Sequence, residues 1–303
     1  MLGINRASNW RDFVEATRHF HAPQQNLFFA DITGDIGLTA PAHLPVRRSG
    51  NGLAPVSGAD AVHDWTGFVP FEALPRVHDP PAGIIVNANN RLVGASYPHL
   101  ITRDWDTSWR ARRIDELFAR TQRHNIRGAA DMQMDTLSTA ARALMPLLLQ
   151  APALSPQAKK TVDLMRHWDF QMRRDRPEPL IYAAWTRQLM KSIAADELGA
   201  LFGDYGPTRP GFLPSVLTGN RHWCDDIRTD ETESCDERIA HALDAALIEI
   251  ARLAGDDLTA WRWGVVHKAD FSHRIFSRIP LIGDLVDMAI ATDGGNDTIN
   301  RGQ

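Results

Sequence analysis

Three asparagines that follow a short apolar run are the residues of this chain best suited to chemistry. The stretch 83–94 reads GIIVNANNRLVG, and its apolar run ends in Asn87, Asn89 and Asn90. Side-chain amide N–H groups at a strand end can hold a developing negative charge without a buried cation, as in an oxyanion hole. The alternative is a plain turn, because asparagine tolerates the left-handed backbone region.

The common catalytic signatures do not accompany these amides. The sequence has no G-x-S-x-G elbow, no H-E-x-x-H pair, no Walker loop and no G-x-G-x-x-G after a strand. The ordinary serine hydrolases, zinc proteases and nucleotide-binding enzymes therefore lose support. An arginine-rich run, RARR at 110–113, follows the asparagines at the start of a predicted helix.

Composition restricts the partners that such a chain could have. It has 303 residues, 44% of them hydrophobic, and a formal net charge of −4. Without a basic stripe we expect no nucleic-acid partner, and the longest apolar stretches fall short of the roughly 20 residues of a membrane span. No targeting signal is recognisable at the N-terminus, which lacks a basic and an apolar region. A small molecule is the expected partner.

Short β-like runs and turn residues fill the first part of the chain, from 26 to about 86. NLFFAD and IGLTAP flank a turn at 32–35, which predicts a β-hairpin. The apolar residues 83–86 predict a further strand leading into the asparagines. Before this region, Asn9 with Asp12 three residues later predicts the start of a helix.

Apolar residues recur with helical period from about 110 to 253. The sequence predicts helices near 110–122, 131–150, 156–168, 178–202 and 236–253, with proline-rich breaks at 152–156, 176–179 and 207–214. After 257 the sequence returns to an irregular or β-like pattern. The predicted fold class is therefore α+β with a large helical insert.

Two cysteines, Cys224 and Cys235, lie in one polar segment that reads WCDDIRTDETESCDER. A disulfide between them would close a short loop, contribute about 3 kcal/mol and indicate an oxidising compartment. The alternative is two free thiols in a reducing compartment. Zinc binding has less support, because a structural site needs four ligands and few lie nearby.

Taken in order, the segments NRASNWRDF, QNLFFADITGDIGLTAP, PPAGIIVNANNRLVG, RDWDTSWRARRIDEL, WRWGVVHKADFSH and GGNDTINR closely resemble the penicillin acylase family of N-terminal nucleophile hydrolases. The resemblance covers nearly the whole chain. It implies one partial domain with part of an αββα-type sheet. In that domain 1–115 is a β-rich part with the oxyanion asparagine, 116–256 is helical, and 257–303 returns to a β or irregular core.

Members of that family are precursors that cut themselves into α and β chains, and the serine that begins the β chain is the nucleophile. This sequence resembles an internal or C-terminal part of the β chain, so we expect that serine, the α chain and the start of the β chain to lie outside it. The resemblance implies hydrolysis of linear amides through an acyl-serine, with β-lactam side-chain amides or N-acyl homoserine lactones as substrates. The competing interpretation is a truncated remnant without activity.

Three site residues follow from the resemblance. Asn89 matches the oxyanion-hole asparagine, and Arg113 matches the arginine that positions catalytic groups. Asp104 would be one ligand of the family's calcium ion, whose other ligands we expect upstream. The cysteine segment fits an exported member, so we expect the full precursor in the periplasm or outside the cell. Because an incomplete sheet exposes strand edges, we expect the isolated chain to be poorly soluble or oligomeric.

Overall fold

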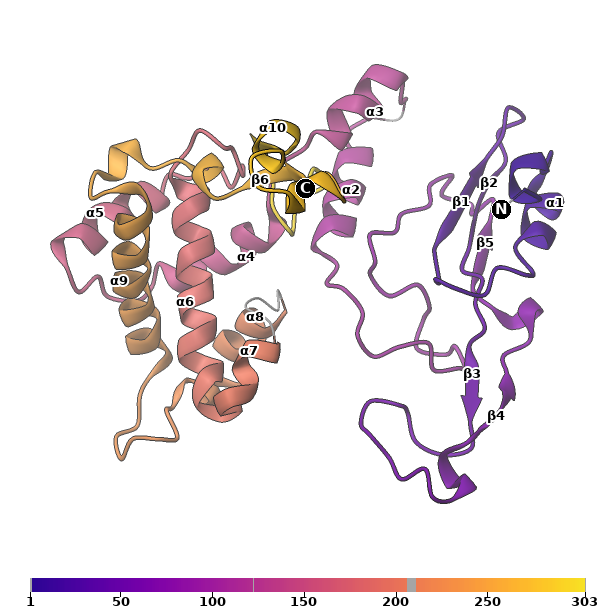
Figure 1. Cartoon of the computed structure of the whole chain (residues 1–303), viewed down its shortest axis with the longest axis horizontal. Coiled ribbons are helices and arrows are strands. Elements are labelled where there is room, and N and C mark those ends of the chain that lie inside the picture. Colours follow the sequence, from indigo (N-terminus) through magenta and orange to yellow (C-terminus); the bar gives the residue numbers. More distant parts are fainter. Residues whose placement is uncertain (1, 122, 206–210, 303) are drawn as a thin grey trace. The chain divides into compact units, whose positions relative to one another are not determined.

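The computed structural model describes residues 2–121, 123–205 and 211–302. The chain divides into two compact units, Met1–Ser108 and Trp109–Gln303, which we call unit 1 and unit 2 (Figure 1). Small antiparallel sheets characterise unit 1, and long helices characterise unit 2. The fold is therefore α+β, as the sequence predicts.

Unit 1 combines a short N-terminal helix with a three-stranded and a two-stranded sheet. Its elements are η1 (Ile4–Arg6), α1 (Trp10–Ala16), β1 (Leu27–Ala30), β2 (Ile36–Thr39), β3 (Pro45–Arg47), η2 (Ala61–His63), β4 (Trp65–Phe68), η3 (Phe71–Ala73) and β5 (Arg76–His78). The larger sheet has the order β1-β2-β5, and β3 pairs with β4.

The predicted hairpin and helix start of unit 1 are confirmed. Strands β1 and β2 pair antiparallel with Phe28 opposite Leu38. The side chain of Asn9 accepts a hydrogen bond of 2.9 Å from the backbone N–H of Asp12, so Asn9 is the N-cap of α1. Phe13 of α1 packs on a ring of β1, and this contact fastens the helix to the sheet.

The predicted strand at 83–86 is wrong. These residues belong to no strand of the structure, and the chain runs through them without ladder partners among the described residues. An apolar run becomes a strand only where a neighbouring strand can take up its backbone N–H and C=O groups. The asparagines therefore follow an irregular extended segment of unit 1.

Unit 2 is mainly helical and ends in a two-stranded hairpin. Its elements are α2 (Trp109–Phe118), α3 (Ile126–Gln133), α4 (Thr139–Leu148), α5 (Pro156–Met165), α6 (Glu178–Leu198), η4 (Gly199–Leu201), α7 (Phe202–Tyr205), α8 (Phe212–Thr218), η5 (Arg221–Cys224), α9 (Cys235–Ala254), η6 (Leu258–Ala260), η7 (Trp263–Val265), β6 (Lys268–Phe271), η8 (Phe276–Arg278), α10 (Gly283–Val286) and β7 (Met288–Ala291). The helices expected near 110–122, 156–168, 178–202 and 236–253 are present with adjusted ends.

One predicted helix is two. The expected helix at 131–150 is interrupted between α3 and α4, where Leu137 forms an isolated β-bridge with Gln171. Ser138 then caps α4, because its hydroxyl accepts from the N–H of Ala141 at 3.0 Å. The break brings Asp135 close to α2. Most of the predicted break at 207–214 lies outside the described residues.

Helices α6 and α9 lie side by side and form the centre of the core of unit 2 (Figure 1). Trp185 of α6 is buried, and its indole N–H donates to the carbonyl of Ile239 in α9 at 2.9 Å. Leu189, Ile193 and Leu243 are also buried here. Burial of each such side chain contributes about 1.5–3 kcal/mol, so this helix pair stabilises the unit.

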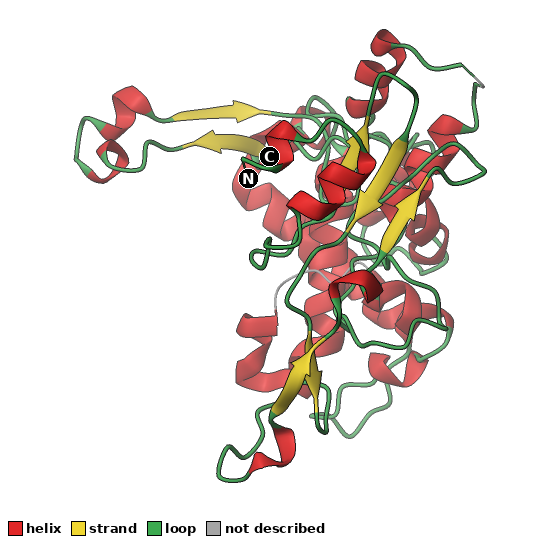
Figure 2. Ribbon diagram, turned by 90° about the vertical axis from the view of Figure 1, so that its right-hand side faces the viewer, coloured by secondary structure: helices red, strands yellow, loops and turns green. Residues whose placement is uncertain are grey.

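The strands β6 and β7 form an antiparallel hairpin whose connecting segment carries η8 and α10 (Figure 2). We call residues 268–291 the apolar arm, because many of its large hydrophobic side chains are exposed, among them Ile275, Leu281 and Leu285. Exposed apolar surface of this kind favours association with another protein surface.

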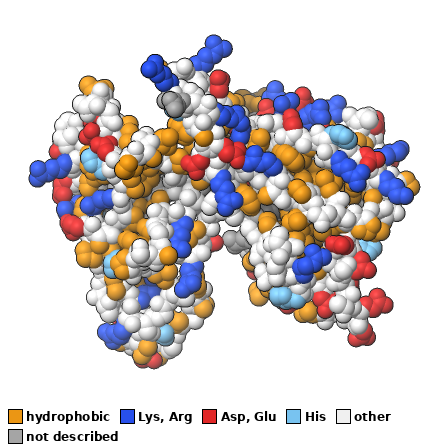
Figure 3. Space-filling view, turned by 180° about the vertical axis from the view of Figure 1, so that it is seen from behind, with side chains coloured by type: hydrophobic (Ala, Val, Ile, Leu, Met, Phe, Trp, Pro, Cys, Tyr) orange, Lys and Arg blue, Asp and Glu red, His pale blue; other side chains and the backbone are white. Residues whose placement is uncertain are grey.

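Charged side chains of both signs are interspersed with apolar ones on the face drawn in Figure 3. That face has no large area of a single charge, in keeping with the formal net charge of −4. Among the described residues, no helix has both the length and the apolar character needed to cross a membrane.

Candidate functional site

Two of the three asparagines hold a tight turn with their side chains. The Asn87 side-chain oxygen accepts from Asn26 at 2.8 Å and from the backbone N–H of Asn89 at 3.2 Å. The Asn87 amide donates to the carbonyl of Asn90 at 3.1 Å. The Asn90 side-chain oxygen accepts from the N–H of Ala88 at 3.0 Å. These two side chains therefore satisfy backbone groups of the turn.

Asn89 occupies a different position in the same turn. Its φ is 66°, in the left-handed region that asparagine tolerates better than most residues. Its carbonyl accepts from the backbone N–H of Asp106 at 3.2 Å, and the residue is exposed. The backbone of Asn89 is thus held on both sides while the residue lies at the surface.

Arg113 of α2 is buried in unit 2 and bound by two carboxylates. Its Nε and Nη2 donate to Asp135 at 2.9 and 2.6 Å, and its Nη1 donates to Glu116 at 2.9 Å. These partners, Asp135 first, raise the pKa of Arg113. Glu116 also accepts from Arg142 of α4, and hydrogen bonding to Arg142 and Arg113 lowers the pKa of Glu116.

The arginine therefore lies in a four-residue ionic cluster of Arg113, Glu116, Asp135 and Arg142 that joins α2 to the start of α4. Sequence reasoning did not identify the two carboxylates. Glu116 could have been found, because it lies three residues after Arg113 on one helix face. Asp135 could not, because its position depends on the break before α4.

Asp104 was expected to bind calcium. It is exposed, and its backbone N–H donates to the Thr102 hydroxyl at 3.0 Å. The one group of three acidic or histidine side chains close enough to share an ion among the described residues is Asp35, His78 and Asp79, without Asp104. Since calcium takes six to eight oxygen ligands and the others are expected upstream of this chain, calcium binding at Asp104 stays a prediction.

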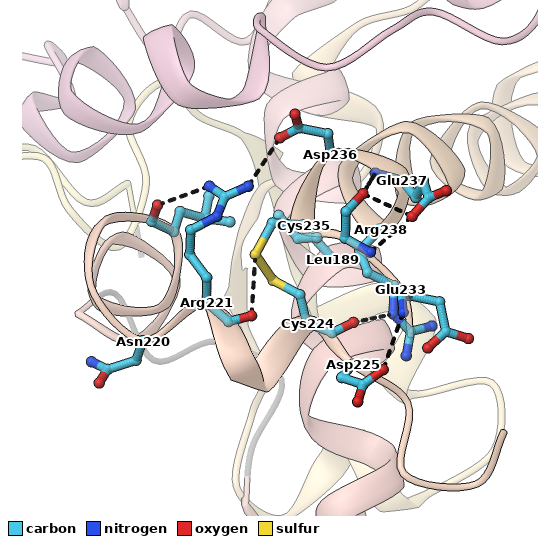
Figure 4. The surroundings of a disulfide bond; sticks show 12 residues. Leu189, Asn220, Arg221, Cys224, Asp225, Glu233, Cys235, Asp236, Glu237 and Arg238 are labelled. Carbon is cyan, nitrogen blue, oxygen red and sulfur yellow. Dashed lines mark hydrogen bonds and ion pairs between the residues drawn. A yellow bond between two sulfur atoms is a disulfide. The ribbon is translucent and has the colours of Figure 1, made fainter. Parts of the chain in front are cut away.

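Cys224 and Cys235 form a disulfide bond that connects η5 to the first residue of α9 (Figure 4). Both residues are buried. The side chain of Arg238 donates to the carbonyl of Cys224 at 2.8 Å, and Ser234 and Glu237 form a capping box at the start of α9. The bond is therefore part of an ordered helix entrance.

An ionic network lies beside the disulfide. Asp226 accepts from the Nε and Nη2 of Arg228 at 2.8 Å each, and it lies 3.2 Å from Arg238. Hydrogen bonding to Arg228, supported by Arg238, lowers the pKa of Asp226 well below its usual value. The backbone N–H of Asp226 donates to Glu233 at 2.8 Å. The segment between the two cysteines is thus fixed by charge as well as by the covalent bond.

Known proteins are similar to this chain in fold and in sequence. The structure matches "Thermostable Penicillin G acylase from Alcaligenes faecalis in orthorhombic form" with a TM-score of 0.70 and 20% identity, over 97% of this chain and 58% of that chain. The chain thus has the fold of the corresponding part of a penicillin G acylase. A family model described as penicillin amidase matches residues 1–303, so the chain belongs to the penicillin amidase family.

Curated relatives come from two kinds of acylase. The chain is 30% identical over 302 residues to the penicillin acylase 2 proenzyme of Pseudomonas sp. (strain SE83), covering 97% of this chain and 38% of that protein. It is 28% identical over 329 residues to the acyl-homoserine lactone acylase QuiP of Pseudomonas syringae pv. tomato (strain ATCC BAA-871 / DC3000), covering 98% of this chain and 39% of that protein. The chain thus spans less than half the length of either relative.

Proposed function

We propose that this chain supplies the oxyanion-binding asparagine of an acylase that hydrolyses linear amides through an acyl-serine intermediate. The observation that carries the proposal is the position of Asn89. It is the exposed, left-handed residue of a turn whose other two asparagines hold the backbone. Family membership indicates the reaction in which the Asn89 amide would take part, because the named relatives are acylases.

In the proposed reaction a serine hydroxyl attacks the amide carbon of the substrate, and the carbonyl oxygen becomes an oxyanion. The side-chain N–H of Asn89 donates to that oxygen and lowers the energy of the tetrahedral intermediate. The α-amine of the serine takes the hydroxyl proton and passes it to the leaving nitrogen, so collapse of the intermediate expels a neutral amine. Water then hydrolyses the acyl-serine through a second oxyanion at the same position. The serine and its α-amine belong, in this proposal, to a segment preceding the chain.

Substrates of the proposed enzyme are β-lactam side-chain amides or N-acyl homoserine lactones, the two classes that the relatives' names contain. In the proposed enzyme Arg113 has a structural role, because its ion pair with Asp135 holds α2 against the segment that precedes α4. We also propose a periplasmic or secreted location for the full precursor. The buried disulfide supports this location, since such bonds persist in oxidising compartments.

A chimera tests the function. Residues 1–303 replace the matching segment of the penicillin acylase 2 proenzyme, and self-cleavage into two chains reports folding. We expect hydrolysis of a chromogenic acyl amide, and Asn89→Ala to lower kcat by about 10²–10³. Asn5→Ala, at an exposed asparagine outside the turn, is the control that leaves kcat unchanged. A chimera that matures but is inactive, or an equally active Asn89→Ala variant, would contradict the proposal and favour a structural remnant.

A further inference from the structure

The residues after Asn89 form a closed loop. The hydrogen bond of 3.2 Å from the Asp106 N–H to the Asn89 carbonyl joins the two ends of segment 90–105. The Tyr97 hydroxyl donates to the carbonyl of Ala73 at 2.9 Å and fastens the middle of the loop to the rest of unit 1. A loop with adjoining ends that packs on its own side chains is an Ω-loop, a type that is frequently functional.

This loop lines an open cavity of about 480 Å³. Every lining residue belongs to the loop itself, with Arg91 and Arg103 as its charged members and Val93, Leu100 and Trp105 among its apolar ones. The volume lies within the range of about 300–1,000 Å³ that is usual for small-molecule sites. The cavity can therefore hold a compact molecule with one apolar surface.

The charge of the cavity has one sign. No aspartate or glutamate is among the described residues that line it. Among the residues that the structure describes, the guanidinium groups of Arg91 and Arg103 make no hydrogen bond and no ion pair. Arginines usually bind carboxylates, and a concave site with two cations and no anion attracts one. Arg113 shows the contrast, because its guanidinium is already bound by two carboxylates.

We propose that the loop 90–105 binds the carboxylate of the amine half of the substrate, an inference that rests on the proposed function. Asn89, the proposed oxyanion residue, directly precedes the loop and closes it through its carbonyl, so we assign the loop to the half of the substrate that leaves as an amine. A bicyclic β-lactam amine carries a carboxylate for Arg91 and Arg103 and an apolar face for Trp105. A homoserine lactone has no carboxylate. The loop thus favours the β-lactam class.

Binding to the chain of residues 1–303 tests the inference without turnover. Isothermal titration with 6-aminopenicillanate should show saturable binding that weakens with added salt, and homoserine lactone should not bind. The double variant Arg91→Gln/Arg103→Gln should weaken binding about tenfold or more. The matched control is Arg274→Gln/Arg278→Gln, which removes the same charge from exposed positions of the apolar arm and should bind as the wild type does.

Three results would overturn the inference. They are no binding to the folded chain, equal binding to the Arg91→Gln/Arg103→Gln variant, and competition by acetate at the same concentration, which would mark a general anion site. Asn89→Ala separates this inference from the proposed function, because it should lower turnover in the chimera and leave binding unchanged. An inactive chimera with selective, arginine-dependent binding would sink the proposed reaction alone.

Discussion

Arg113 of α2 forms a bidentate ion pair with Asp135, which lies in the break between α3 and α4. Arg113 is 3% exposed, and its Nε and Nη2 lie 2.9 and 2.6 Å from the two carboxylate oxygens of Asp135. The backbone carbonyl of Asp135 in turn accepts from the N–H of Asn300 at 3.0 Å. One ion pair thus links the first helix of unit 2 to a segment that also holds its C-terminal loop.

Removing the Arg113 charge should destabilise unit 2 strongly. Arg113→Met leaves Asp135 partly buried without its counter-ion, and breaking such a pair costs about 3–5 kcal/mol. Urea unfolding followed by circular dichroism measures the loss. Arg112→Gln, at the exposed neighbouring arginine, is the control and should change the free energy of unfolding by less than about 0.5 kcal/mol. Equal effects of the two variants would show that the pair contributes nothing.

Local sequence chemistry predicted the helices and the first hairpin. Asn9 and Asp12 fix the start of α1 through contacts within one turn, and the apolar spacing of α9 needs only its own side chains. The prediction of a strand at 83–86 is wrong because a strand needs hydrogen-bonded neighbouring strands, and a local sequence pattern does not show whether they are present. The helix at 131–150 failed because a bridge between Leu137 and Gln171 interrupts it.

The candidate site shows the same limit. The asparagine-rich sequence indicated the turn, but the different positions of Asn87 and Asn89 in it depend partly on Asn26, which is distant in sequence. The spacing alone does not distinguish which of the three asparagine amides holds the backbone and which is exposed. Likewise, the arginine run could not show that Arg113 is buried while Arg112 is exposed, since burial depends on how α2 packs on α4.

Loss of the disulfide should lower stability by about 3 kcal/mol, because the bond closes a short loop of the unfolded chain. The expected variant is Cys224→Ala/Cys235→Ala, compared with the wild type in urea with and without reductant. Reductant should shift the wild-type midpoint towards that of the variant and leave the variant unchanged. Because both cysteines are buried, reduction in the absence of urea should be slow. A wild-type midpoint that ignores reductant under unfolding conditions would refute this prediction.

Asp226 should contribute to stability above about pH 4 and lose that contribution in acid. Hydrogen bonding to Arg228 lowers its folded-state pKa, so the contribution is present above the unfolded value of about 3.9 and is lost as the pH falls through the folded pKa. Asp226→Asn should be less stable than the wild type at pH 7, and the difference should shrink below pH 4. Asp230→Asn, at an exposed position of the same loop, is the control. A pH-independent difference would contradict the linkage.

The apolar arm should make the isolated chain associate. Leu281 and Leu285 are 82% and 85% exposed in the segment between β6 and β7, and contiguous apolar surface of this kind is buried when copies meet. Leu281→Lys/Leu285→Lys should reduce the average mass measured by light scattering at equal concentration. The control Ile126→Lys/Leu201→Lys adds the same charge at exposed apolar residues outside the arm, so it separates interruption of the arm from a general gain in solubility. A monodisperse wild-type monomer, or equal improvement by both variants, would show that the arm does not drive association.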